Sequence, residues 1–396
     1  MTDISKALDL IHRAHARNPY DLLADDEQSK QNTHSKELLH YAILPSKRLR
    51  ASREWIELNH LRLKASLSKD EKEEITSNFE LWLNDARETL LLFKDINGEY
   101  VTIQAKNRFI SKSSAVEQLK KLEQAFSIAL QNNWNAVFLT LTLPPIFPLQ
   151  VQRWLLSFLL HRIKAYIRKR EKKTVPHVKV NEPHKDFRLH LHIVIFDINF
   201  IMRKHDLTLY LNKHLENFLR NLGEHYKRTI NKRADDDVVI ALNKYGKKLL
   251  RKYKAYKRSK KGFKGPINHL SAIKQLDGSY VFKDAPRDAR KVAKTLNDGG
   301  QVSVFDYIKF YVMKNVSEAS QIAEADESKP IKVSSIELAF YWYARLPFFT
   351  MSPPLRQPRP PREPAGWTYI GTIRKDEAPT TVLIKPPLPV WLDGML

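Results

Sequence analysis

Residues 182–196 read EPHKDFRLHLHIVIF and place one glutamate and three histidines directly before an apolar strand. Side chains at positions i and i+2 of a strand point to the same face of a sheet, so His190 and His192 project together. Residues 177–181 and 189–196 are predicted to form two strands, and the short connection between them favours a hairpin. In a tight hairpin, Glu182 faces the histidine pair. Two imidazoles and one carboxylate can hold a divalent ion and leave open positions for water or substrate oxygens.

The histidine pair alone is a weak signal. The chain contains 14 histidines, so a His-x-His pattern can arise by chance. An alternative is two surface histidines on an amphipathic strand, with His177 and His184 as ordinary surface and turn residues. A metal site therefore needs support from elsewhere in the chain.

A second unusual segment is DYIKFYVMKN, residues 306–315. On a helix, Tyr307 and Tyr311 lie four residues apart on one face, Lys314 joins them, and Lys309 points the other way. A phenol oxygen can act as a covalent nucleophile, and an ammonium group can hold a phosphate. Paired tyrosines at this spacing are more often a packing feature, so the segment alone leaves both interpretations open.

Hydrophobic periodicity predicts the other elements of an α+β fold. Residues 1–115 are predicted to be helical, with a capping box at Ser68–Glu71, and a second box at Ser114–Glu117 is predicted to open the next helix. The β-branched, apolar stretch AVFLTLTL predicts a buried strand at residues 136–143, closed by two prolines. Further helices are predicted at residues 149–172, 206–222 and 302–316.

The chain is strongly basic, with 67 Lys and Arg residues against 44 acidic residues and a net charge of +23. Such a surplus favours a polyanionic partner, because Lys and Arg neutralise nucleic-acid phosphates. Residues 244–264 contain eleven basic residues and no acid, interleaved with aromatic residues. The expected DNA contacts there are Lys247, Lys248, Arg251, Lys252, Lys254, Lys257 and Arg258. The alternative is a solvated charged loop.

Several classes of protein are excluded by what the sequence lacks. Without cysteine it has no disulfides, zinc ribbons or thiolate nucleophiles. It shows no signal-peptide core and no apolar run long enough to span a membrane, which predicts a soluble protein of a bacterial or host cytoplasm. The P-loop pattern is also absent, so a built-in helicase is not expected.

Three motifs in order resemble those of the HUH endonucleases, most closely the phage gene A and rolling-circle replication initiators with two tyrosines. They are the strand segment FLTLT at 138–142, the Glu182-Pro-His and His190-Leu-His192 segment, and Tyr307-x-x-x-Tyr311-x-x-Lys314-Asn315. The resemblance covers about residues 134–316. Two departures are the residues Phe187–Leu189, where relatives usually carry a Gly-Thr-Pro turn, and a Phe rather than a Lys directly before the second tyrosine.

The resemblance implies a ferredoxin-like antiparallel sheet with flanking helices, in a nuclease domain spanning residues 116–320 with a basic insertion at 227–298. The helical N-terminal region would precede this domain, and a C-terminal region with a proline-rich tail would follow it at 321–396. Glu182, His190 and His192 are expected to hold Mg²⁺ or Mn²⁺. Tyr307 or Tyr311 is expected to attack single-stranded origin DNA, with Lys314 on the phosphate, and a host helicase and polymerase are expected partners.

Other functions stay open at this point. Relaxases and single-strand transposases are related enzymes, although two tyrosines four residues apart favour replication. An iron oxygenase or cupin also uses His-x-His on a strand, but it needs regularly spaced strands downstream, where this chain has helices and basic runs. A basic DNA-binding protein with incidental histidines is the non-enzymatic alternative.

Overall fold

The computed structural model describes most of the chain beyond residue 67. The described residues are 68–95, 100–104, 109, 112–183, 188–230, 232, 234, 236–260, 263–276, 278–295, 302–324, 330–333, 336–343, 346–356, 367–374 and 383–385. The helices predicted within residues 1–67 lie outside this range. In the described part, no helix is both long and apolar enough to cross a membrane.

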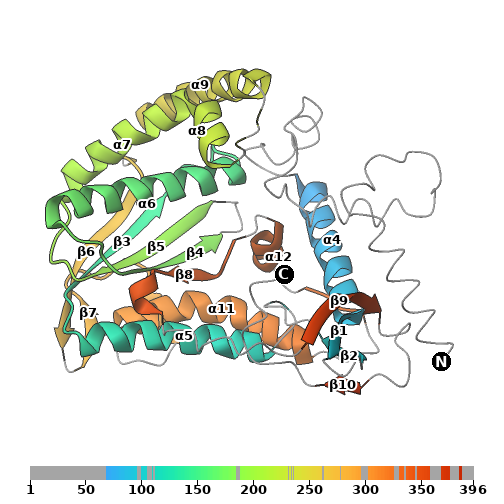
Figure 1. The fold of residues 1–396 in the computed structure, drawn as a ribbon. Coiled ribbons are helices and arrows are strands. Elements are labelled where there is room, and N and C mark those ends of the chain that lie inside the picture. The colour runs from blue at the N-terminus through green and yellow to red at the C-terminus, as the bar shows by residue number, and fades with distance from the viewer. Residues whose placement is uncertain are drawn as a thin grey trace.

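The centre of the molecule is a six-stranded antiparallel sheet with the strand order β7-β6-β3-β5-β4-β8 (Figure 1). Strands β3 and β5 lie in the middle and are almost wholly buried, which explains their continuous apolar sequences. The strands are β3 (Ala136–Thr142), β4 (His177–Pro183), β5 (Leu189–Phe196), β6 (Ile267–Leu276), β7 (Ser279–Phe282) and β8 (Phe349–Met351). The fold is therefore α+β, as predicted.

Helices cover both faces of this sheet (Figure 1). One face packs against α6 (Leu149–Glu171) and α7 (Lys204–Arg220), with α8 (Leu222–Thr229) and α9 (Asp236–Ser259) further out. The other face packs against the neighbouring helices α5 (Lys112–Gln131) and α11 (Val304–Glu324). The helices predicted at 149–172, 206–222 and 302–316 are confirmed, because they correspond to α6, α7 and α11.

The segment predicted as a basic insertion contains two strands of the central sheet. β6 pairs with β3 along most of its length, and β7 forms a hairpin with β6. The basic residues predicted to contact DNA lie before these strands, on the helix α9 (Asp236–Ser259) and not on a loop. β6 is only partly buried, and its sequence INHLSAIKQL lacks the continuous apolar run that is typical of a central strand. This strand was therefore not predicted.

The basic helix α9 lies very close to α7 and α8. A Cβ atom on Gly246 would come within 2.0 Å of the Leu219 carbonyl oxygen, and one on Gly223 within 2.1 Å of the Val239 carbonyl oxygen. Both glycines are therefore needed for the close approach of the backbones.

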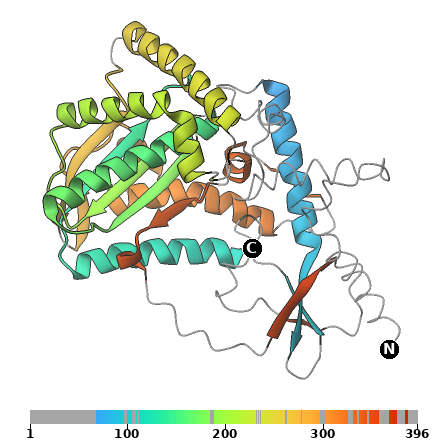
Figure 2. The same ribbon diagram turned by 45° about the horizontal axis from the view of Figure 1, so that its top comes forward.

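A second, four-stranded sheet stands apart from the first, with the order β10-β2-β1-β9 (Figure 2). Its strands are β1 (Thr89–Asp95), β2 (Tyr100–Gln104), β9 (Trp367–Arg374) and β10 (Leu383–Lys385). The helical prediction is thus wrong for residues 89–95 and 100–104, which form strands. The C-terminal region was predicted only as a proline-rich tail. Two of its segments, residues 367–374 and 383–385, are strands that pair with the distant strands β1 and β2.

Helix α4 (Lys69–Glu88) leads into β1 and confirms the first capping box. The Ser68 backbone N–H donates to Glu71 Oε2 at 2.8 Å, and the Glu71 N–H donates to Ser68 Oγ at 3.2 Å. The second box does not mark a helix start, because α5 begins at Lys112, two residues before Ser114. The remaining helices are α10 (Ala289–Thr295), α12 (Ile336–Tyr343) and a 3₁₀ turn at Pro353–Leu355.

Candidate functional site

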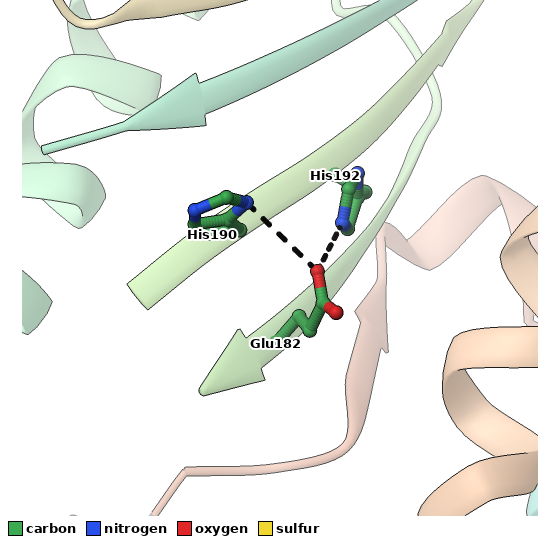
Figure 3. Close-up of side chains that lie close together, drawn as sticks. All are labelled: Glu182, His190 and His192. Atoms are coloured by element: carbon green, nitrogen blue, oxygen red, sulfur yellow. Dashed lines mark hydrogen bonds and ion pairs between the residues drawn. The ribbon is translucent and has the colours of Figure 1, made fainter. Parts of the chain in front are cut away.

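The hairpin of β4 and β5 brings the predicted metal ligands together. Glu182 lies directly opposite His190 in the antiparallel register, and His192 lies two residues further along the same face of β5. Glu182 Oε2 is 2.9 Å from His192 Nε2 and 3.9 Å from His190 Nδ1 (Figure 3). The three ligand atoms all lie within 4.8 Å of one another. This group could hold a metal ion.

The surroundings of His192 fit a metal ligand. The ring is almost fully buried, and its second nitrogen, Nδ1, lies 3.1 Å from Thr140 Oγ1 on the neighbouring strand β3. A metal-binding histidine usually donates its other N–H to an oxygen, which fixes the ring and its tautomer. With Nε2 used for an ion, Nδ1–H would donate to the Thr140 hydroxyl. Thr140 belongs to the motif FLTLT, but no pattern in the sequence indicates its contact with His192.

The two tyrosines of α11 lie on the same face of the sheet as the histidines. The Tyr311 ring stacks on the His192 ring, with centroids 4.6 Å apart and an angle of 21° between the planes. The Tyr307 ring meets His192 edge-on at 5.7 Å and Phe138 at 5.5 Å. Residues 115 positions apart in the chain, His192 and Tyr307, are therefore parts of one site.

A carboxylate that the sequence did not indicate joins both phenols. Tyr307 donates to Asp288 Oδ1 and Oδ2, both at 3.0 Å, and Tyr311 also donates to Asp288 Oδ2. Burial, the largest cause, raises the pKa of both phenols well above its ordinary value, and the charge of Glu182 and the hydrogen bonds to Asp288 raise it further. Both phenols therefore keep their protons at neutral pH.

The two lysines of α11 have different surroundings. Lys309 faces α5, where its Nζ lies 3.4 Å from Glu123 Oε1. Lys314 is half-exposed, and its Nζ lies 3.5 Å from Oε1 of the buried Glu337 on α12. Lys314 thus has a partner that the sequence did not suggest, and its role on a phosphate stays a prediction.

His177, also on the β4–β5 hairpin, does not belong to the group. His177, on β4, points to the opposite face of the sheet, where its Nε2 lies 3.5 Å from Lys164 Nζ. Burial and the positive charge of Lys164 lower the pKa of His177 to about 4. His184 and the rest of the hairpin connection, residues 184–187, lie outside the described residues.

Helix α9 presents the predicted DNA-binding residues to solvent. Its apolar side packs inward through residues such as Leu242, Leu249 and Tyr253, which are buried. The exposed side includes all seven predicted residues, Lys247, Lys248, Arg251, Lys252, Lys254, Lys257 and Arg258. This basic surface lies on the side of the sheet away from α11 (Figure 1).

Comparisons with models of protein families, with curated proteins and with solved structures found no match to this chain. The functional assignment therefore depends on the chemistry of the site.

Proposed function

We propose that this protein is a metal-dependent DNA nickase of the HUH type that initiates rolling-circle replication. The observation that supports it most is the stacking of Tyr311 on His192, because it puts a nucleophile beside a metal ligand. A phosphodiester bound at Glu182, His190 and His192 would then lie next to both phenols. Neither ordinary packing tyrosines nor surface histidines require this arrangement.

The topology supports the ferredoxin-like architecture that the motif resemblance implies. Strands β3, β4, β5 and β6 follow one another with α6 after β3 and α7 after β5, and their spatial order is β6-β3-β5-β4. This is the β-α-β-β-α-β arrangement of ferredoxin-like folds. The metal ligands lie on the two adjacent strands β4 and β5, and α11 covers them.

In the proposed reaction, a phenol oxygen of Tyr307 or Tyr311 attacks the phosphorus of a single-stranded DNA linkage. An O–P bond to tyrosine forms, the bond from phosphorus to the 3′ oxygen breaks, and a free 3′-OH remains as a primer. Mg²⁺ or Mn²⁺ held by Glu182, His190 and His192 would polarise the phosphate as a Lewis acid. No ATP is needed, because the phosphotyrosine preserves the energy of the broken linkage.

Two tyrosines in one site suit a replication initiator. The first would stay joined to the 5′ end while a host polymerase and helicase copy the circle, and the second would cut the regenerated origin. The basic surface of α9 would bind the DNA backbone through phosphate contacts, which add affinity but no sequence specificity. Relaxases and single-strand transposases share the chemistry, but the presence of both phenols on one carboxylate favours the two-tyrosine type.

The test is a covalent adduct between protein and DNA. The unaltered chain, incubated with Mn²⁺ and a pool of single-stranded oligonucleotides, should give a slower band on a denaturing gel. The double variant Tyr307→Phe with Tyr311→Phe should give none, whereas Tyr210→Phe on α7 should behave like the unaltered chain. Adduct formation by the double variant would exclude both nucleophiles. Salt-sensitive DNA binding without any adduct from the unaltered chain would favour a non-enzymatic DNA-binding protein.

A further inference from the structure

Tyr307 and Tyr311 share a single carboxylate. Asp288 accepts hydrogen bonds from both hydroxyl groups, and the two phenol oxygens are themselves 3.4 Å apart. Asp288 is held in place by its backbone, since its carbonyl oxygen accepts from the N–H groups of Lys291 and Val292 in the first turn of α10. The side chain is therefore left to meet the phenols rather than to cap the helix.

We propose that Asp288 is the proton acceptor for both tyrosines and passes a proton from one to the other during the reaction. This role rests on the proposed nickase function and adds to it a catalytic residue outside the three sequence motifs. A phenol that donates a hydrogen bond to a carboxylate keeps its proton until the oxygen attacks, and it then needs an acceptor within hydrogen-bond reach. Asp288 meets this requirement for each phenol.

The cleavage step balances with Asp288 as the base. As the phenol oxygen forms its bond to phosphorus, its proton moves to Asp288, and the electron pair of the breaking P–O bond goes to the 3′ oxygen. The 3′ oxygen takes a proton from water. In the reverse step the 3′-OH attacks the phosphotyrosine and gives its proton to water. The bond from phosphorus to the phenol oxygen breaks, and Asp288 returns its proton to that oxygen.

Sharing one carboxylate also explains how two tyrosines can act in turn. When the second tyrosine attacks the regenerated origin, its proton moves to Asp288. When the first tyrosine is then displaced by a 3′-OH, it takes that proton. The other carboxylates near the described site have different partners: Glu182 contacts His192, and Glu337 contacts Lys314. Asp288 is the carboxylate that lies between the two phenols.

The test uses two backgrounds, Tyr307→Phe and Tyr311→Phe, each with one nucleophile left. Asp288→Asn keeps the shape of the side chain and removes its basicity. We expect it to slow single-turnover adduct formation by about 10²–10⁴-fold in both backgrounds, the usual contribution of a general base. Asp288→Glu should recover part of the rate. The matched control is Asp284→Asn, an exposed carboxylate on the same loop, which should stay within about twofold of its background.

A second measurement separates a base from a structural residue. In Asp288→Ala, added formate should raise the rate of adduct formation, whereas chloride at equal ionic strength should not. Normal adduct formation by Asp288→Asn, or a loss confined to one background, would overturn the shared role and leave the nickase function intact. Formate without effect would overturn the base role in the same way. Absence of an adduct from the unaltered chain would refute the nickase function and the role of Asp288 with it.

Discussion

The hydroxyl of Thr140 is the clearest point at which to test the metal site without measuring activity. Thr140 is buried on β3, directly opposite His192, and its Oγ1 lies 3.1 Å from Nδ1 of that ring. Thr140→Val keeps the shape of the side chain and removes the hydroxyl. An ion bound at Nε2 requires Nδ1 to carry the proton, so the variant leaves a buried N–H without an acceptor.

The expected loss follows from this one hydrogen bond. A buried polar group that loses its partner costs about 1–3 kcal/mol, and about 1.4 kcal/mol corresponds to a tenfold change in affinity. Changes to the outer partners of metal-binding histidines typically weaken affinity about 10–100-fold. We therefore expect Thr140→Val to weaken Mn²⁺ binding by about 10–100-fold in calorimetric titrations of the protein without DNA.

The same strand offers a matched control. Thr142 lies two residues further along, on the same face and opposite His190, and its buried Oγ1 has no hydrogen-bond partner among the described residues. Thr142→Val should leave Mn²⁺ affinity within about threefold, because no hydrogen bond is lost. Equal losses in both variants, or no loss in Thr140→Val, would refute the reasoning that Thr140 orients a metal ligand.

Three further changes test the fold and the basic surface. Gly246→Ala should destabilise the protein by about 1–3 kcal/mol in urea unfolding, because its Cβ would meet the Leu219 carbonyl oxygen; a more stable variant would contradict the close packing of α9. Lowering the pH from 7.5 to 5.5 should cost roughly 1 kcal/mol of stability through His177, whose folded pKa of about 4 lies below the unfolded value near 6.5. Stability from this group is present above pH 6.5 and lost as the pH falls towards 4, so His177→Gln should show a smaller loss. Replacing Lys247 and Arg251 by Gln should flatten the salt dependence of DNA binding by about 1.5 in log–log slope; an unchanged slope would remove α9 from the DNA-binding surface.

The elements around the metal site could be predicted because their signals are local. Strand β5 matches its predicted bounds, and β3 and α6 end within one residue of theirs. Each has either a continuous apolar run or a clear helical period. The approach of Glu182 to the two histidines could also be predicted, because it depends only on the register of a hairpin, and a short connection fixes that register.

The second sheet could not be predicted, because two of its four strands come from the far end of the chain. Residues 89–95, TLLLFKD, follow α4 without a break and continue its apolar spacing, so they look like the end of a helix. Their partner β9 begins at Trp367, beyond a proline-rich stretch. β1 also pairs with the nearby strand β2, but its other edge is covered by β9, a non-local partner that no pattern near residue 89 encodes.

Asp288 was missed for a similar reason. It precedes Tyr307 by 19 residues and Tyr311 by 23, and only the turn from β7 into α10 brings its carboxylate to the phenols. A lone aspartate between Arg287 and Ala289 resembles any residue at a helix start. Tyr307 and Tyr311 could be selected by their residue type and spacing, whereas Asp288 has neither signal.

The candidate metal site also depends on a part of the chain that contributes none of its three side chains. Strand β4 is held between β5 and β8, and β8 comes from residues 349–351. The neighbour of Glu182, Asn181, donates from Nδ2 to the Pro347 carbonyl oxygen at 2.9 Å, and its own carbonyl oxygen accepts from Tyr341. A slip of one residue in β4 would turn Glu182 to the opposite face of the sheet and away from His192. Residues 336–343 and 346–351 therefore help to fix the register that brings Glu182 and the two histidines together, although the motifs of the site end at residue 315.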